Sequence, residues 1–352
     1  MLSAAEAATK RAALEQVMGP AGPRPAADAD YLTLVDEVDC GSYVRYAATF
    51  ATGPGCRTPA ILCVPHRCLG PSPERRPAVL CLMETDAIGT LSLVGLGSRP
   101  NRAYASELAE RGFVTLSPTY PLFPGYLDSP TQLSKLGYSS GTRKAVHDNQ
   151  LAIDCLAALD YVSMAAGVVC VGHSLGGHVR MPLPEYPSPS RPFWFAALMR
   201  LLLLQNALFT AAFDKRVSAV VSSCGFTRWR WNDNERRGQP GDLSDWTGPK
   251  YMPRIASEFG SRAENMPFDW PDVLSLIAPR PVFVNAPVDD DCFRVEGVRE
   301  CQTEWESWPS SAVPAMQSQW HYPSCGHDFP PDLRELAWQF VSSVLWAATP
   351  KL

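Results

Sequence analysis

A serine flanked by glycines is the residue in this chain best suited to covalent chemistry. Residues 172–177 read GHSLGG, which fits the pattern GxSxG with Ser174 at its centre. The apolar run GVVCVG at 167–172 leads into it and is typical of a buried strand. In this pattern a tight turn from strand to helix exposes the serine hydroxyl, and the glycines let strand and helix pass closely. The stretch therefore predicts a nucleophilic serine.

Later parts of the chain offer the base and the acid that such a serine needs, because a free hydroxyl is a weak nucleophile. The stretch CGHDF, after an expected strand at 319–325, contains His327. The stretch NAPVDDDCF, at the end of an expected strand at 280–287, contains three acids: Asp289, Asp290 and Asp291. Nucleophile, acid and base would then follow strand ends in that order along the chain.

The composition excludes several kinds of partner. The chain has 352 residues, 46% of them hydrophobic, so it can bury a large core. Its formal net charge is −5. This charge gives no attraction for nucleic acid or an anionic membrane, and we expect neither as a partner. The most apolar stretch, 193–204, contains Arg200 and is too short for a membrane span, which needs about 20 residues. The N-terminal stretch reads as an amphipathic helix rather than a signal, so we expect a cytoplasmic protein.

The cysteines point to reduced thiols. There are 11, scattered and odd in number, and several lie in strand-like apolar runs, as Cys63, Cys81 and Cys170 do. This pattern favours buried thiols over a disulfide framework. No CxxC pair occurs, and Cys325 with His327 is one short pair without further ligands. We therefore expect no metal and no cofactor.

Strands alternate with helices along the chain, which predicts an α/β fold with a mainly parallel sheet and helices on both faces. After a helix and a linker at 1–30, we expect one domain over 31–352. The strands are expected at 31–38, 43–50, 59–65, 77–83, 113–118, 167–172, 216–224, 280–287 and 319–325. The helices beyond the N-terminal one are expected at 101–113, 139–162 and 331–348.

The segment 179–205 interrupts this pattern directly after the serine turn. Five prolines fall within it, and proline cannot occupy a helix interior: Pro182, Pro184, Pro187, Pro189 and Pro192. Without the segment the chain reads GHSLGGHNALFTAAFD, one unbroken amphipathic helix. We predict an insertion here, with the helix cut short near His178 and resuming near Asn206.

Three origins of this insertion remain open. The segment begins with Val179, whose codons start GT, and ends with Gln205, one of whose codons ends AG, which fits a retained intron. It could instead be an inserted lid over the site. It could also be a loop that faces a partner, because 193–204 is strongly apolar.

From about residue 75 to the end, the chain resembles the α/β-hydrolase superfamily, and more narrowly the dienelactone-hydrolase and acetylxylan-esterase-like serine hydrolases. The matching stretches include SGTRKAVHDNQLAIDCLAALDYV, GHSLGGH, GDLSDWTGPKYMPRI, MPFDWPDVLSLIAPRPVFVNAPVDDDCF and CGHDFPPDLRE. The resemblance implies Ser174 as the nucleophile and His327 as the base. It also implies that the acid lies three residues beyond Pro287, which ends the strand, and so selects Asp290.

The resemblance further implies an oxyanion hole built from two backbone N–H groups. One would be that of Leu175, directly after the nucleophile, and the other would lie near Glu84, after the strand at 77–83. Related proteins commonly carry a His-Gln-Thr-Thr-like run there, whereas this chain reads METD. If the carboxylate of Glu84 or Asp86 points into the site, we expect it to disfavour a developing oxyanion, so that neutralising it would raise the rate.

The function implied is that of a serine hydrolase that cleaves a small-molecule carboxylic ester, or a thioester or amide, through an acyl-enzyme. One alternative is a peptidase of the prolyl-oligopeptidase type, which shares the order of the triad but carries a propeller-sized domain not expected here. Another is a catalytically impaired isoform or scaffold, because of the insertion and the two carboxylates. Four tryptophans could line an apolar pocket, although we favour a place for them in the core: Trp229, Trp231, Trp246 and Trp270.

Overall fold

The computed structural model describes residues 2–25, 31–86, 88–174, 206–234, 239–309 and 318–347. Their main feature is a nine-stranded sheet with the order β1-β2-β3-β5-β4-β6-β7-β10-β11. The strands from β1 to β5 in this order pair antiparallel, and those from β5 to β11 pair parallel. The expected mainly parallel sheet is confirmed. The strands are β1 (Leu32–Asp39), β2 (Tyr43–Gly53), β3 (Cys56–Pro65), β4 (Arg76–Leu82), β5 (Val114–Pro118), β6 (Val162–His173), β7 (Val217–Ser223), β10 (Val282–Asn285) and β11 (Gln319–His321), and a small hairpin is formed by β8 (Asp233–Asn234) and β9 (Gln239–Pro240).

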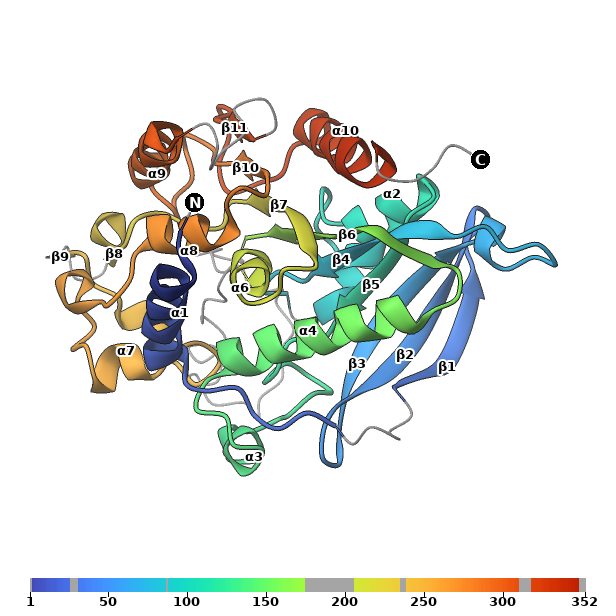
Figure 1. Ribbon diagram of the computed structural model, residues 1–352, viewed down its shortest axis with the longest axis horizontal. Coiled ribbons are helices and arrows are strands. Elements are labelled where there is room, and N and C mark those ends of the chain that lie inside the picture. Colours follow the sequence, from blue (N-terminus) through green and yellow to red (C-terminus); the bar gives the residue numbers. More distant parts are fainter. Residues whose placement is uncertain are drawn as a thin grey trace, which may run out of the picture.

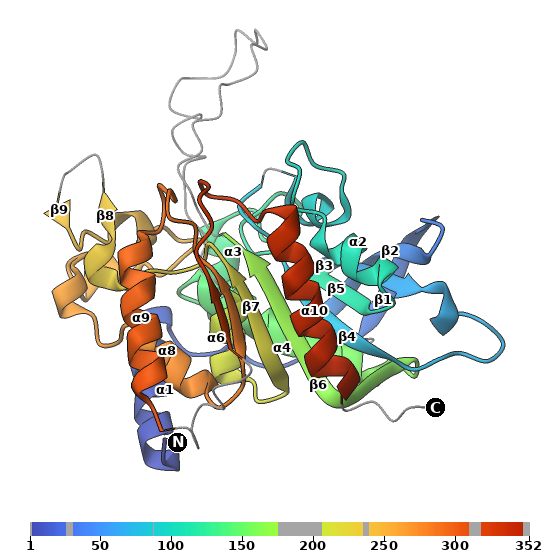
Figure 2. The ribbon, with the colours of Figure 1, turned by 90° about the horizontal axis from the view of Figure 1, so that it is seen from above.

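Helices cover both faces of the sheet (Figure 1), as expected. On one face α2 contacts β5, and α10 contacts β6 and β7; on the other, α4 and α6 contact β6 and its neighbours. Figure 2 shows the same layers from above, with α10 and α4 on opposite sides of the strands. The α-helices are α1 (Ala4–Met18), α2 (Tyr104–Glu110), α3 (Pro130–Lys135), α4 (Gly141–Ala158), α6 (Asn206–Phe213), α7 (Arg254–Ser257), α8 (Trp270–Ile277), α9 (Val295–Ser307) and α10 (Pro331–Ala347). The short 3-10 helices are η1 (His66–Cys68), η2 (Gly89–Val94), η3 (Trp229–Trp231), η4 (Ser244–Trp246) and η5 (Ala263–Asn265).

The centre of the sheet is apolar on both faces, as a covered parallel sheet requires. The last six residues of β4 and of β6 are all buried, as are six of the seven residues of β7. All 11 cysteines are free thiols and eight of them are buried, in agreement with the expectation from the sequence. Burial raises the pKa of Cys63 to about 12, so this thiol stays protonated and inert. No helix among the described residues has the length and apolar character that crossing a membrane demands.

The N-terminal helix packs on the rest of the molecule. Ser3 caps it: the Ser3 hydroxyl oxygen accepts from the Glu6 N–H, and the Ser3 N–H donates to the Glu6 carboxylate, so both halves of a capping box are present. Leu14, Val17 and Met18 are fully buried, and α1 contacts α7 and α8.

Several boundaries differ from the expected pattern, among them the one between α4 and β6. The helix expected at 139–162 ends at Ala158, and β6 begins already at Val162. The early residues of β6 pair with Arg76 and Pro77 at the start of β4, which takes them out of the helix. Gly167 then carries a register shift with φ of +71°, and a Cβ there would lie 2.3 Å from the Arg216 carbonyl oxygen. The turn thus needs glycine.

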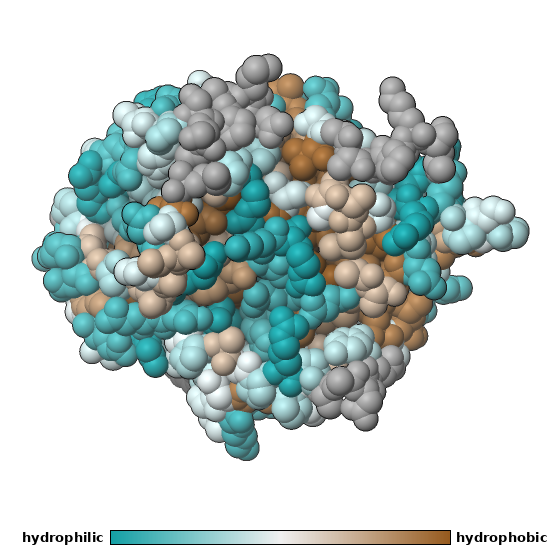
Figure 3. Space-filling model, in the orientation of Figure 1, coloured by the Kyte–Doolittle hydropathy of each residue, from teal (hydrophilic) through white to brown (hydrophobic). Residues whose placement is uncertain are grey.

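The tryptophans are mostly core residues, as favoured from the sequence. Trp229, Trp246 and Trp270 are at most 2% exposed and contact one another through Trp229, with ring centroids 5.5 Å apart in both pairs. Trp231 is half-buried, and its indole N–H donates to Glu300 Oε1 at 2.9 Å. Elsewhere on the surface, hydrophobic residues gather on the side where β1 to β3 lie (Figure 3), and the exposed members on β1 are Leu34, Val35 and Val38.

A buried ion pair within α4 is hydrogen-bonded to Tyr126 on the loop after β5. The Lys144 ammonium contacts the Asp148 carboxylate one helical turn later, and both side chains are at most 1% exposed. The Tyr126 hydroxyl donates to the second oxygen of Asp148 at 2.7 Å, and Thr58 donates to the Tyr126 hydroxyl at 2.7 Å. All polar groups named here thus find a partner within the core.

We predict that Lys144→Met strands a buried carboxylate and lowers the free energy of unfolding by about 3–5 kcal/mol. The measurement is urea denaturation followed by tryptophan fluorescence. Lys135→Met, on the exposed end of α3, is the control and should change stability by about 0.5 kcal/mol or less. Equal effects of the two variants would show that the ion pair is unimportant for the fold.

Candidate active site

Ser174 lies directly after β6, in the backbone conformation that the sequence pattern predicts. Its φ is +50°, in the left-handed region that side chains other than glycine rarely adopt. Its N–H donates to the Ser223 carbonyl oxygen at 2.7 Å, which ties the turn to the end of β7. Such strain persists where the surrounding structure fixes it, and it occurs preferentially at functional sites. The residue is 4% exposed, so its hydroxyl sits within the molecule rather than on its surface.

The structure brings Ser174, Asp290 and His327 together. His327 follows β11, and its Nε2 is in hydrogen-bond contact with Ser174 Oγ. Asp290 follows β10, and its Oδ1 and Oδ2 lie 2.9 and 3.0 Å from His327 Nδ1. Because an ionised carboxylate only accepts, this arrangement fits the tautomer with the proton on Nδ1, which leaves Nε2 as an acceptor. Among the three consecutive acids it is Asp290 that orients the ring.

The carboxylate of Asp290 is itself held in place. Its Oδ1 accepts the N–H groups of Cys292 at 2.8 Å and Phe293 at 3.2 Å, and the side chain is 1% exposed. The Phe293 ring lies over the His327 ring, with centroids 6.0 Å apart and planes 28° from parallel. The acid and the ring are thus fixed by backbone and by packing, as a preorganised site requires.

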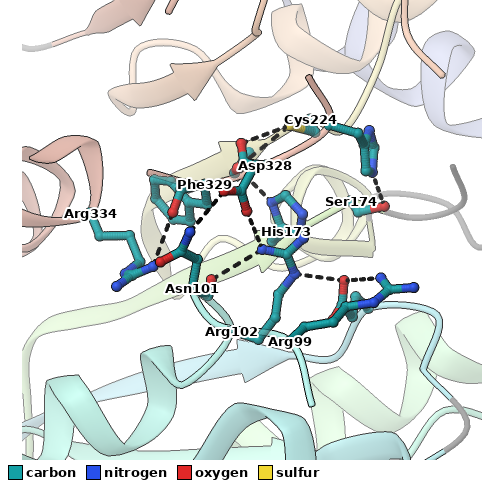
Figure 4. A network of polar contacts seen from close by, with 12 residues as sticks. Arg99, Asn101, Arg102, His173, Ser174, Cys224, Asp328, Phe329 and Arg334 are labelled. Carbon is teal, nitrogen blue, oxygen red and sulfur yellow. Dashed lines mark hydrogen bonds and ion pairs between the residues drawn. The ribbon is translucent and has the colours of Figure 1, made fainter. Parts of the chain in front are cut away.

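A second histidine lies beneath this trio. His173, fully buried at the end of β6, has its Nδ1 2.7 Å from the Ser223 hydroxyl, which also accepts from Asn285 Nδ2 at 2.8 Å. Its ring centroid is 5.4 Å from that of His327 (Figure 4 shows His173 beside Ser174). Burial, and then the positive charge of Arg102, hold the pKa of His173 well below its usual range. The ring under the site is therefore neutral.

The structure changes the electrostatic expectation for the loop after β4. Glu84 is fully buried, but its Oε2 accepts from Arg99 Nη1 at 3.1 Å and from Arg102 Nε at 2.8 Å. Two guanidinium groups therefore balance this carboxylate, and removing it would take one carboxylate contact from each of them. Asp86 Oδ1 accepts the Ile88 N–H at 3.1 Å. Leu175, the other expected oxyanion donor, lies outside the described residues.

Sequence reasoning missed the charged residues beside the triad. Asp328 directly follows His327, and its carboxylate accepts from Arg102 Nη1 at 2.6 Å and Asn101 Nδ2 at 2.7 Å (Figure 4). Burial opposes ionisation of Asp328, but these two hydrogen bonds prevail and hold its pKa below the ordinary value. The only signal in the sequence was the pair of arginines in SRPNRAY, far from the histidine along the chain.

Among the described residues, Cys224, Asp290 and His327 offer ligand atoms within 4.8 Å of one another. Sulfur, oxygen and nitrogen at such spacing suit a cation such as Zn²⁺. Two of these residues, however, already form the hydrogen bond that orients the ring. Burial raises the pKa of Cys224 well above its usual value, which keeps it from acting as a thiolate. A cation would therefore have to displace the triad contact.

A cavity of about 440 Å³ lies away from these three residues, none of which lines it. Its walls come from η3, β9, η5 and the start of α8, and include Trp229, Arg230, Glu264 and Phe268. We therefore do not assign it to the candidate active site.

No family model matches the sequence, and no curated protein matches it either. Solved structures do match. They include a glucuronoyl esterase from Solibacter usitatus, with 15% identity, a TM-score of 0.58, and coverage of 95% of this chain and 92% of that one. A glucuronoyl esterase of carbohydrate esterase family 15 from Caldicellulosiruptor kristjansonii has 14% identity and a TM-score of 0.57, covering 96% and 85%. A Bacteroides fragilis protein assigned as an acetyl xylan esterase has 14% identity and a TM-score of 0.56, covering 93% and 76%. The chain thus has the α/β-hydrolase fold that its motifs led us to expect.

The neutral state of His173 predicts a pH effect on stability. Its pKa is lowered in the fold, so below about pH 6.5 the unfolded chain takes up a proton that the folded chain does not. This one group should therefore lower the free energy of unfolding by up to about 1.4 kcal/mol per pH unit below that value. Urea titrations at pH 7.5 and 5.5 should show a smaller loss of stability for His173→Gln than for the wild type.

Val171→Ala, a cavity variant on the same strand, is the control because it removes packing without removing a titrating group. It should keep the wild-type difference between the two pH values. If His173→Gln also keeps that difference, the buried ring does not carry this effect.

Proposed function

We propose that the protein is a serine hydrolase that cleaves carboxylic esters of small molecules through an acyl-enzyme. The observation that carries this proposal is the position of His327, whose two ring nitrogens contact Ser174 Oγ and the Asp290 carboxylate. A hydroxyl, an imidazole and a carboxylate in this sequence of contacts are the parts of a nucleophile activated by an oriented base.

The reaction follows from the roles of these three groups. Ser174 Oγ attacks the ester carbonyl while His327 Nε2 accepts its proton, and the imidazolium that forms is stabilised by Asp290. His327 then donates the proton to the departing alcohol, which leaves an acyl group on Ser174. Water, activated by the same imidazole, releases the acid and restores the hydroxyl. The oxyanion would be stabilised by the backbone N–H groups of Leu175 and Glu84.

An ester substrate is supported by the structural neighbours, which are described as glucuronoyl and acetyl xylan esterases. The balanced charge of Glu84 also removes one reason to expect an impaired isoform or scaffold, because two arginines offset the carboxylate near the oxyanion position. The acyl group and the alcohol are left open by these arguments.

Hydrolysis of p-nitrophenyl esters of graded acyl length tests the proposal. Ser174→Ala and His327→Ala should each reduce kcat by roughly four orders of magnitude or more, because no group replaces the nucleophile or the base. Asp290→Asn should cost about 10⁴-fold, because the amide favours the wrong tautomer of His327. Asp289→Asn, at the exposed neighbouring position, is the control and should stay near the wild type.

The opposite pattern would contradict the proposal. Residual activity of Ser174→Ala at the wild-type level would mean that the hydrolysis arises elsewhere. Cleavage of peptides with no activity on any ester would favour the peptidase alternative.

We further propose that 179–205 is an insertion into the helix that follows the nucleophile. The support is that the residues after this segment, Asn206–Phe213, are helical, as the sequence pattern predicted, and that this helix, α6, packs against α4, α8 and β7. The expected end near His178 lies outside the described residues.

We predict that the protein lacking 179–205 is more soluble and melts at a higher temperature, because it no longer carries the apolar run at 193–204. Its kcat on p-nitrophenyl esters should exceed that of the full chain, since an unbroken helix would support Ser174. A soluble but inactive deletion protein would instead identify the segment as a working lid. Sequencing transcripts across the region reports its origin separately.

A further inference from the structure

A network of three charged side chains joins two loops that meet at the candidate active site. Glu84 lies on the loop after β4, Arg102 precedes α2, and Asp328 follows His327. Arg102 Nε donates to Glu84 Oε2 at 2.8 Å, and its Nη1 donates to Asp328 Oδ1 at 2.6 Å. In Figure 4 the Arg102 side chain runs between the segment of Asn101 and that of Asp328. One guanidinium group therefore connects carboxylates from two separate loops.

Burial makes these contacts costly to break, so they restrict the movement of the side chains that form them. The side chains of Glu84 and Arg102 are 1% and 5% exposed, and that of Asp328 is 38% exposed. Charges taken out of water are strongly destabilising unless they are paired, so Glu84 and Arg102 cannot separate at low cost. The planar fork of arginine also fixes direction, because each N–H must point at its own carboxylate oxygen.

At one end of this network, the contacts of Asp328 restrict the movement of the base, His327. Asp328 is joined to His327 by the peptide bond, and its carbonyl oxygen accepts from Asn285 Nδ2 at 2.9 Å and Cys224 Sγ at 3.2 Å. The Asp328 backbone is thus bonded to the ends of β7 and β10, while its side chain is bonded to Arg102. Together these contacts leave His327 little freedom to move away from Ser174.

At the other end of the network, the contacts of Glu84 hold the loop that carries the proposed oxyanion donor. Glu84 comes two residues after the last residue of β4, and its own N–H is the second donor of the proposed function. Its side chain is held from one side only, because Oε1 is buried without a hydrogen-bond partner in the described part of the chain. Arg99 and Arg102 at Oε2 therefore fix how this loop lies.

We infer that Arg102 is a positioning residue that aligns the base with the oxyanion donor, through Asp328 on one side and Glu84 on the other. The inference rests on the proposed function for its kinetic consequence. A placement error of about 1 Å at a reacting group can cost roughly 100-fold in rate. Removing Arg102 should therefore affect kcat more than KM, although it touches neither Ser174 nor substrate.

The test compares Arg102→Met and Arg102→Lys with the control Arg111→Met. Arg111, at the other end of α2, pairs with Glu335 on the surface, with side chains 37% and 52% exposed. We expect Arg102→Met to lower kcat on p-nitrophenyl esters about 10- to 100-fold with KM within a factor of about three. Arg102→Lys should recover only part of the loss, because an ammonium cannot serve both carboxylates with fixed directions. The control should match the wild type.

A mutant cycle separates positioning from simple destabilisation. Glu84→Gln and Asp328→Asn change residues that are linked through Arg102, so their effects on kcat should be non-additive. In the Arg102→Met background the same two changes should become additive. Additive effects in the wild-type background would overturn the inference, as would a lower melting temperature in Arg102→Met with unchanged kcat.

A second readout does not depend on activity. The Nδ1 proton of His327, held by Asp290, should give a far-downfield NMR resonance in the wild type that broadens or shifts in Arg102→Met and not in Arg111→Met. If the wild type hydrolyses no ester while this resonance still responds, positioning stands and the proposed function fails. If the wild type is active and neither kcat nor the resonance responds, the proposed function stands and the inference fails.

Discussion

The site depends on the contacts of the His327 imidazole with Ser174 and Asp290. These contacts join three residues that follow three different strands. Ser174 follows β6, Asp290 follows β10 and His327 follows β11. All three strands run parallel, so their carboxyl ends lie at one edge of the sheet. The sheet therefore brings together side chains that are 153 and 37 residues apart in sequence. The loops after these strands then determine the final alignment of the three side chains.

The loops align the site because its polar side chains are held by hydrogen bonds and by packing. Asp290 is held by two backbone N–H groups, the His327 ring by Phe293, and the following residue by Arg102. Under the site, His173 is kept neutral, so this ring adds no positive charge next to His327. Beside it, Glu84 is balanced by two arginines. The ionisable groups around the triad are thus either neutral, as His173 is, or paired with an opposite charge, as Glu84 and Asp328 are.

The sequence predicted the parts of this arrangement that follow from local pattern. The apolar run before GHSLGG implied a buried strand, and Ser174 is found at its end with a positive φ. The residues alone leave three consecutive acids open, and the resemblance to known serine hydrolases selects Asp290, the residue that contacts His327. The tryptophans expected in the core are largely there because apolar bulk alone predicts burial.

Other features could not be predicted, because they depend on contacts across the fold. The Glu84–Arg102 and Arg102–Asp328 bonds join residues 18 and 226 positions apart, and charged residues usually lie on the surface. The METD stretch therefore suggested repulsion, whereas the fold supplies compensating cations. The boundary between α4 and β6 was also missed, since Val162 belongs to the strand only through pairing with Arg76.

The claim that Ser174 is an activated nucleophile is tested most directly by a fluorophosphonate probe, followed by mass spectrometry of the labelled peptide. An activated Ser174 should take up one stoichiometric label in the wild type, react much more slowly in His327→Ala, and leave no label at this position in Ser174→Ala. Absence of label in the folded wild type, or labelling of a different serine, would contradict it.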